Sequence, residues 1–319
     1  MVSPQSTPTS TSPSNASASA DAASSMSAPI DLARVRRLFA RPQVVAPSDF
    51  LRREIAGRMR ERLALVKISP QRVLDAGCGA GADLALLQRD YPAAQVLGLD
   101  AAQAMAAAAR PALSAGKSLL KRLLPARAGI DVLAGDFGAL PFGPNSIDLV
   151  WSNLALHWHP QPDRVFAEWR RVLNVDGVLM FSNFGPDSLR ELRVAFAEVD
   201  DGAHVLPFVD MHDFGDQLVG AGFSTPVMDM EVITVTYDTA QALLADVRAL
   251  GGNPLATRSR GLMGSAAGMR LQAALERGRS ADGKLVLTFE VLYGHAFRPA
   301  PRVTAAGEAI VRFQPRRPG

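Results

Sequence analysis

The stretch Val73-Leu-Asp75-Ala-Gly77-Cys78-Gly79-Ala-Gly81 decides the fold of this chain. It continues a short apolar run at 72–75 that reads as a strand, and it leads into a helical pattern at 82–89. Glycines at such a junction let the backbone turn tightly and come close to a bound ligand. The junction therefore predicts a cofactor site, although a glycine-rich loop alone does not specify which cofactor.

Four more apolar runs of strand length follow, and helical patterns alternate with them. Strands that alternate with helices predict a parallel sheet covered on both faces. Right-handed crossovers then give a Rossmann-like, doubly wound α/β sheet. The strand patterns lie at 96–100, 130–134, 147–151 and 177–182, and the helical patterns lie at 101–110 and 163–173.

The alternation changes after residue 182. Helical patterns are expected at 187–200, 211–221 and 239–250, and strand patterns at 227–237 and 284–297. The segments 185–208 and 238–282 fall where loops at the carboxyl edge of the sheet would lie, so we expect helical lid insertions there. Before the first strand, residues 31–66 also read as helical because Leu51, Ile55, Met59 and Leu63 recur every four residues.

Composition narrows the class of protein. The chain has 319 residues, of which 48% are hydrophobic and 20% charged, as is typical of a globular protein. It contains no apolar run of about 18 residues, which excludes a transmembrane helix. The single cysteine, Cys78, excludes a disulfide framework and a multi-cysteine metal site, so we expect a reduced, cytoplasmic protein.

The two ends of the chain differ from its middle. Residues 1–29 are almost all Ser, Thr, Ala and Pro without Lys or Arg, which predicts a disordered tail rather than a signal peptide. Residues 30–297 form the expected domain, and 298–319 form a tail with five arginines and one glutamate. A second basic stretch, 110–127, contains no acid. Either basic stretch could face an acidic partner or simply be solvated.

Two acidic residues follow the second and third strands. Asp100 ends the second strand, about 20 residues after the glycines, where a carboxylate can accept both hydroxyls of a ribose. Asp136 and Phe137 follow the third strand, where an acid and an aromatic ring could bind and cover an adenine.

Together these motifs resemble the class I S-adenosylmethionine (SAM) dependent methyltransferases over about residues 70–184. The motifs are DAGCGAG, LGLD, GDF, IDLVWSNLALHW and RVLNVDGVLMFS. The loop differs from that of the dinucleotide-binding dehydrogenases, and the absence of a following Lys-Ser/Thr excludes a P-loop. The resemblance implies SAM as methyl donor and a mostly parallel seven-stranded sheet with an antiparallel last strand.

The resemblance also implies roles for individual residues. Asp75 and the loop would face the methionine part of SAM, although Asp75 could instead only orient the loop. Asp100 would take the ribose hydroxyls and Asp136 the adenine amino group. Cys78 is interpreted as a small residue in a tight loop, not as a nucleophile. The implied cofactor-binding residues are Asp75, Gly77, Cys78, Gly79, Gly81, Asp100, Ala101, Asp136, Phe137, Asn153 and Leu154.

Over about 34–297 the chain is similar to the malonyl-ACP O-methyltransferases of biotin synthesis, and in part to a related mitochondrial complex I assembly factor. The similar stretches are FSNFGPDSLRELR (181–193), AFAEVD (195–200) with His204, DMHDFG (210–215), AGF (221–223), VMDME (227–231) and VRALG (247–251). The biotin enzymes often carry a Tyr before the first strand, and the stretch 36–50 has none. This departure leaves the acceptor less well defined than the cofactor.

The implied chemistry is attack of a carboxylate on the methyl group of SAM. A carboxylate is ionised at pH 7, so no general base is needed. Positioning in a site that excludes water would supply the catalysis. We therefore expect neither a catalytic triad nor a metal.

Several residues are substrate-side candidates, and each could instead serve packing or solvation. His157, Trp158 and His204 would lie near the transferred methyl group or in the first lid segment. Three arginines of the second lid segment could hold the thioester carbonyl or a phosphopantetheine phosphate. They are Arg248, Arg258 and Arg260. A basic stretch, Lys117, Lys121 and Arg122, could dock an acidic acyl carrier protein.

Three functions remain open at this point. The favoured one is methylation of the carboxylate of malonyl-ACP or malonyl-CoA, by a monomer with no membrane partner. The second is SAM-dependent methylation of another small molecule or of RNA. A nucleic-acid amino-methyltransferase is disfavoured because 152–155 reads Ser-Asn-Leu-Ala rather than Asn/Asp-Pro-Pro-aromatic. The third is a methyltransferase-fold assembly factor that binds a partner protein and methylates nothing.

Overall fold

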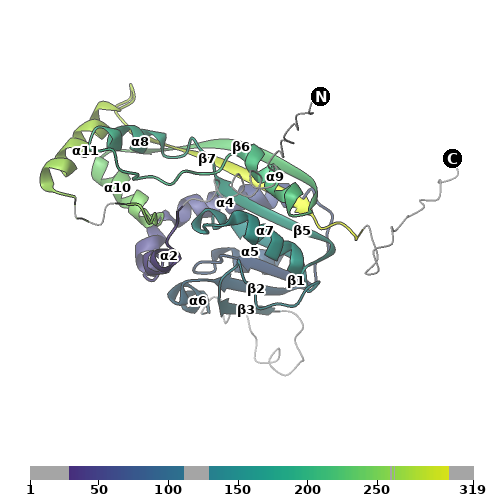
Figure 1. Ribbon diagram of the computed structural model, residues 1–319. Helices are drawn as coiled ribbons and strands as arrows, with labels where there is room; N and C mark the ends of the chain where they lie inside the picture. Colours follow the sequence, from purple (N-terminus) through teal and green to yellow (C-terminus); the bar gives the residue numbers. More distant parts are fainter. Residues whose placement is uncertain (1–28, 111–128, 259–260, 262, 302–319) are drawn as a thin grey trace, which may run out of the picture.

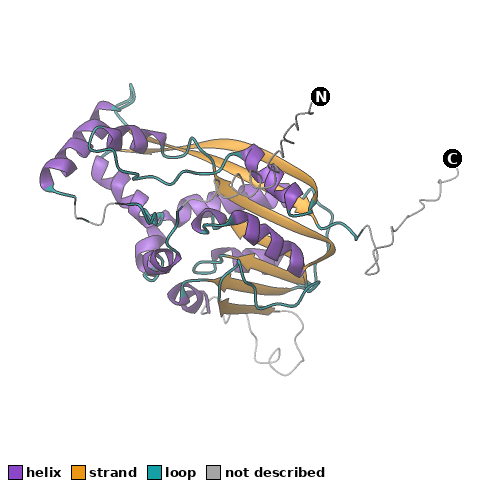
Figure 2. Ribbon diagram, viewed as in Figure 1, coloured by secondary structure: helices purple, strands orange, loops and turns teal. Residues whose placement is uncertain are grey.

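The computed structural model describes residues 29–110, 129–258, 261 and 263–301, and these form one sheet with helices around it. The sheet has seven strands in the order β3-β2-β1-β4-β5-β7-β6 (Figures 1 and 2). Neighbouring strands from β3 to β5 run parallel, and β7 runs antiparallel to both β5 and β6. The strands are β1 (Arg72–Ala76), β2 (Gln95–Asp100), β3 (Gly129–Ala134), β4 (Ile147–Asn153), β5 (Leu173–Phe184), β6 (Ser224–Tyr237) and β7 (Leu285–Phe297). The predicted fold class is confirmed, including its antiparallel last strand.

Helices cover both faces of the sheet and gather over its carboxyl edge (Figure 2). The α-helices are α2 (Leu32–Leu38), α3 (Pro42–Val45), α4 (Asp49–Leu63), α5 (Ala82–Asp90), α6 (Gln103–Ala109), α7 (Pro162–Val172), α8 (Arg190–Ala197), α9 (Met211–Gly220), α10 (Ala240–Ala249) and α11 (Ser265–Arg277). Two 3₁₀ turns, η2 (Ala46–Ser48) and η5 (Leu156–Trp158), complete the elements used below.

Two predictions of local structure need correction. The helical stretch at 31–66 is three helices and a 3₁₀ turn, because Pro42 and Pro47 cannot continue a preceding helix and instead begin new elements. Helix α11 was not predicted, because Gly264 and Gly268 mask its helical pattern in the sequence. Its buried residues Leu271, Ala274 and Leu275 nevertheless recur at helical spacing.

Two apolar layers hold the helices to the sheet. On one face, Leu51, Ile55 and Met59 of α4 are fully buried against the sheet. On the other, Phe166 of α7 packs against the rings of Phe181 on β5 and Phe214 on α9, and Trp169 packs against Phe166. Strand β6 alternates between half-buried and exposed residues, as expected for the edge strand that it forms.

The lid helices α8, α10 and α11 lie together at one end of the molecule, with α2 beside α10 (Figure 1). Residues 29–34 form hydrogen bonds with the segment that follows α10. Asp31 N–H donates to Pro254 O at 3.0 Å, Ala256 N–H donates to Pro29 O at 2.7 Å, and Arg34 Nε donates to Asn253 O at 2.9 Å. Helix α2 is therefore held directly against the second lid segment. No helix in the described ranges is both long and apolar enough to cross a membrane.

Substitution of Gly294 tests the packing of the sheet. An added Cβ at this β7 residue would lie 2.3 Å from Cε1 of Phe181, its partner on β5. We expect Gly294→Ala to lower the free energy of unfolding by about 1–3 kcal/mol through overpacking, as measured by urea denaturation. The matched control is Gly57→Ala in α4, where a Cβ meets no atom within 4 Å, and it should raise that free energy by up to about 1 kcal/mol. Equal stability of Gly294→Ala and the parent protein would contradict this packing.

Candidate functional site

A cavity of about 120 Å³ opens at the carboxyl ends of β1, β2 and β4, where the strand order reverses. This reversal point is where open α/β sheets bind their ligands. We call it the glycine-loop cavity. Its wall includes Asp75, Gly77, Cys78, Gly79, Asp83, Asp100, Ala101, Phe137, Asn153, Leu154 and Trp158.

Two loop positions favour glycine, Gly77 because of its backbone conformation and a close neighbour, and Gly79 because of its backbone conformation alone. Gly77 has φ +89°, and an added Cβ would lie only 2.3 Å from the Cβ of Ala155, so nothing larger fits. Its N–H donates to Leu99 O at 2.8 Å, which fixes the loop to the end of β2. Gly79 has φ +53°, and its N–H donates to a carboxylate oxygen of Asp100 at 2.9 Å. The loop thus lies across the ends of two strands.

Asp100 is half-buried at the end of β2 and lines the cavity, and its predicted contact with a ribose stays a prediction. Its second carboxylate oxygen accepts the Ala102 N–H at 2.8 Å. Burial raises the pKa of Asp100, and the two N–H donors act against this rise. Each oxygen keeps a further lone pair, so the carboxylate can still accept two hydroxyl groups.

Two further carboxylates lie in the same wall. Asp75 is only 2% exposed, and its Oδ2 has no hydrogen-bond partner within the described part of the chain. Burial raises the pKa of Asp75 well above its usual value, and the charges of Asp83 and Asp100 raise it further. Sequence reasoning missed Asp83, whose Oδ2 accepts from Trp151 Nε1 and Asn153 Nδ2, both at 3.0 Å. An acid directly after the glycine loop was the available signal. Three carboxylates around so small a space favour a cationic ligand.

Asn153 connects the cavity to its surroundings. Besides Asp83, its Nδ2 donates to Arg52 O on α4 at 3.0 Å, and its Oδ1 accepts from Ser182 Oγ on β5 at 2.9 Å. Leu154, the next residue, has φ +51° and lines the cavity. The end of β4 is therefore fixed by its neighbours on both sides.

Two predicted cofactor residues do not line this cavity. Gly81 has φ +84° and precedes α5, where an added Cβ would lie 2.8 Å from the Cβ of Ala109. Asp136 accepts the Gly138 N–H at 2.8 Å and lies 3.9 Å from a guanidinium nitrogen of Arg36. Their predicted contacts with a cofactor stay predictions. Phe137 does line the cavity, and its ring lies 6.0 Å from that of Trp169.

Cys78 occupies the loop as a small buried residue. Burial, followed by the charge of Asp75, raises the pKa of its thiol. The thiol stays protonated at neutral pH and is a poor nucleophile. This agrees with the interpretation of Cys78 as a packing residue.

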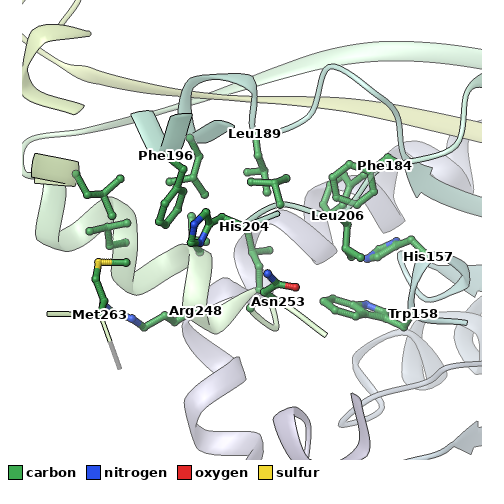
Figure 3. A pocket seen from close by; sticks show the side chains of 18 of the residues that line it. His157, Trp158, Phe184, Leu189, Phe196, His204, Leu206, Arg248, Asn253 and Met263 are labelled. Atoms are coloured by element: carbon green, nitrogen blue, oxygen red, sulfur yellow. The ribbon is translucent and has the colours of Figure 1, made fainter. Parts of the chain in front are cut away.

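A second cavity, of about 310 Å³, lies beneath the lid helices, and we call it the lid cavity (Figure 3). Most of its wall is apolar, with Phe184, Leu189, Phe196, Leu206 and Met263 among the residues shown. His157 and Trp158 stand at one end, and Arg248 and Met263 lie toward the other. Trp158 lines both this cavity and the glycine-loop cavity, so the two meet at its indole ring.

His157 is held among aromatic rings at the junction. Its Nδ1 lies 2.6 Å from Asn183 Oδ1, and its ring lies 5.2 Å from Phe184 and 4.8 Å from Trp158. Burial lowers the pKa of His157 to about 4. The ring is therefore neutral at pH 7, and it places no charge beside the junction.

Some of the other substrate-side candidates line the lid cavity and others do not. His204 lines the lid cavity, stacked on Phe196 with ring centroids 3.9 Å apart and hydrogen-bonded to Asp200 at 2.6 Å. Arg248 also lines it. Arg258 does not, because its guanidinium donates to Leu255 O at 2.9 Å and lies outside the described cavity walls. The remaining basic candidates lie outside the described residues, namely Lys117, Lys121, Arg122 and Arg260.

Arg52 is the cation that sequence reasoning missed. It comes from α4, lines the glycine-loop cavity and donates to Ser48 Oγ, with Asp49 at 3.5 Å and Leu250 O at 3.4 Å. Burial lowers its pKa. Its charge also lowers the pKa of His157, which places it near the junction of the two cavities. It is one of five arginines on this helix, and nothing in the sequence singled it out.

Comparisons with known proteins agree with this geometry. A family described as "Methyltransferase domain" matches residues 74–181. The chain is 49% identical to a malonyl-[acyl-carrier protein] O-methyltransferase of Laribacter hongkongensis, over 90% of this chain and 97% of the relative. It is 46% identical to a protein of the same name from Gallionella capsiferriformans, over 89% and 96%. The crystal structure of the YcgJ protein of Bacillus subtilis has the same fold, with a TM-score of 0.54 and 16% identity over 78% of this chain and all of that one.

The cost of burying Asp75 gives a prediction for stability. Because its folded pKa is raised, the wild-type protein loses stability as the pH rises through that pKa. We expect Asp75→Asn, without added ligand, to raise the free energy of unfolding at pH 7.5 by roughly 1–3 kcal/mol. The gain should shrink as the pH is lowered toward 4, where the wild-type carboxyl is protonated. Urea denaturation at several pH values measures both.

The matched control is Asp216→Asn, which removes an exposed carboxylate from α9. It should change the free energy of unfolding by less than about 0.5 kcal/mol at either pH. If Asp75→Asn were destabilising at pH 7.5, the carboxylate would be satisfied in the free protein and our interpretation of it would be wrong.

Proposed function

The chain belongs to the malonyl-[acyl-carrier protein] O-methyltransferase family, and from this premise we propose that it methylates the free carboxylate of a malonyl group held as a thioester on acyl carrier protein. The chain is a SAM-dependent methyltransferase, and SAM is its methyl donor. The methyl ester would hide a charge that enzymes of fatty-acid synthesis reject. That role corresponds to an early step of biotin synthesis, as the sequence resemblance implies.

The glycine-loop cavity fits SAM. SAM supplies a methyl group on a positively charged sulfonium, which a nucleophile can attack in line. Asp75 would face the methionine part. Its Oδ2 is buried and has no hydrogen-bond partner among the described residues, so it can pair with a cationic group of the ligand. Asp100, held by two backbone N–H groups, would accept the ribose hydroxyls. Phe137 would form an apolar wall beside the adenine.

The observation that carries the proposal is the meeting of the two cavities at Trp158. The glycine-loop cavity is acidic, whereas the lid cavity is mostly apolar and is lined in part by residues of α8, α10 and α11. A malonyl thioester in the lid cavity would bring its free end to Trp158 and so to the donor. His204 and Arg248 line the same cavity and could hold its carbonyl groups.

The residues at the junction suit an ionised acceptor. A carboxylate is charged at pH 7, so no side chain has to remove a proton. The neutral ring of His157 and the surrounding aromatic residues exclude water without binding the carboxylate as a cation would. Arg52 offsets the nearby acids, and its charge is partly compensated by Asp49. Removal of water from two opposite charges favours the transfer that neutralises them.

The direct test is mass spectrometry of malonyl-ACP incubated with the purified protein and SAM. We expect malonyl-ACP to gain one methyl group. Acetyl-ACP, which lacks the free carboxylate, should gain none and is the matched control. Absence of any gain on malonyl-ACP, with SAM binding verified separately, would contradict the proposal and favour an assembly factor or another acceptor.

Asp100→Ala tests the donor site separately. Loss of the charge-assisted hydrogen bonds to the ribose should weaken SAM binding at least tenfold, as measured by calorimetry. Asp131→Ala on the neighbouring strand β3 removes an exposed carboxylate and should leave the affinity unchanged. Undiminished affinity of a folded Asp100→Ala protein would show that the ribose lies elsewhere.

A further inference from the structure

A third hollow, of about 660 Å³, lies on the outer side of the lid and is strongly basic. Arg34, Arg37 and Arg41 come from α2 and the turn after it, and Arg248 comes from the end of α10. We call these four residues the arginine vestibule. The rest of the described lining is Leu38, Ala40, Val44, Gly252 and Asn253, and none of it is acidic.

These positive charges are poorly compensated. Arg37 has one loose ion pair, at 3.8 Å to Asp31. The guanidinium of Arg34 donates to the backbone carbonyl of Asn253, whereas the backbone N–H of Arg34 donates to the carboxylate of Asp31. Burial, followed by the charges of Arg258 and Arg37, lowers the pKa of Arg34, as expected among like charges. Neither Arg41 nor Arg248 forms an ion pair within the described ranges. Such a surface favours an anionic partner.

The vestibule adjoins the lid cavity. Arg248, Gly252 and Asn253 line both spaces, and Figure 3 shows Arg248 and Asn253 at the edge of the lid cavity. Gly252 has φ +68°, and an added Cβ there would lie 3.9 Å from Cδ2 of Leu38, so a side chain at this position would project between α2 and the segment after α10. A backbone hydrogen bond of Asp31 and a side-chain hydrogen bond of Arg34 hold this segment against the N-terminal part of α2. The hollow therefore lies next to the cavity in which we place the malonyl thioester.

We infer that the arginine vestibule is the docking surface for the acidic face of the acyl carrier protein. The phosphate of the phosphopantetheine arm would lie among the arginines, and the arm would pass Gly252 into the lid cavity. Val44, 45% exposed between the arginines, offers the apolar contact that a protein partner needs. The inference rests on the proposed function, and it places docking away from the basic stretch at 117–122.

The test is the double variant Arg37→Glu/Arg41→Glu, which leaves the lid cavity residues intact. We expect KM for malonyl-ACP to rise about tenfold or more with kcat little changed, because the charges act on association rather than on transfer. Turnover of malonyl-pantetheine, which has neither a phosphate nor a carrier, should not change. The salt dependence of KM for malonyl-ACP, strong in the wild type, should weaken in the variant.

The matched control is Lys67→Glu/Arg89→Glu, which makes the same change in charge on exposed residues beside the amino ends of β1 and β2. Its kinetics with malonyl-ACP should equal those of the wild type. Unchanged KM for malonyl-ACP in the vestibule variant, or an equal rise in the control, would overturn the inference. Arginine-dependent binding of tRNA without any effect on malonyl-ACP kinetics would overturn it as well. Failure of the wild type to methylate either substrate would instead refute the proposed function.

Discussion

The contact between the glycine loop and the end of β2 is the constraint on which the site depends. Two loop N–H groups donate to Leu99 O, and a third donates to Asp100, so loop and carboxylate hold each other in place. The approach of Gly77 to Ala155 extends the same contact to the turn that carries His157 and Trp158. The donor site and the acceptor side are therefore positioned by one short loop.

This arrangement stabilises a ligand at the expense of the free protein. Asp75 and Asp83 are buried and Asp100 is half-buried in the wall of one cavity, and burial raises the pKa of each. A cationic group in the glycine-loop cavity would compensate their charges. At Trp158, where this cavity borders the lid cavity, aromatic residues exclude water. The chain contributes binding, charge and exclusion of water. In our account none of its side chains forms a covalent bond with the substrate.

Much of this could be predicted from the sequence because it depends on local patterns. The glycine loop, Asp100 and the alternating strands have spacings that follow from backbone geometry, and the seven-stranded sheet agrees with them. The three helices α2, α3 and α4 were predicted less well. The sequence pattern reads as a single helical stretch, although Pro42 and Pro47 begin new elements within it. The role of Arg52 and the arginine vestibule could not be predicted from the sequence. Both depend on contacts between parts of the chain that are far apart in sequence, namely the segment 34–52 and the region around residues 248–253.

The central claim is that donor and acceptor occupy two cavities that meet at Trp158. The most direct measurement is a crystal structure with S-adenosylhomocysteine and a stable malonyl thioester analogue bound together. The account predicts the ribose on Asp100, the sulfur directed toward Trp158, and the malonyl carboxylate in the lid cavity facing that sulfur. A malonyl group bound outside the lid cavity, or a donor whose sulfur points away from Trp158, would contradict it.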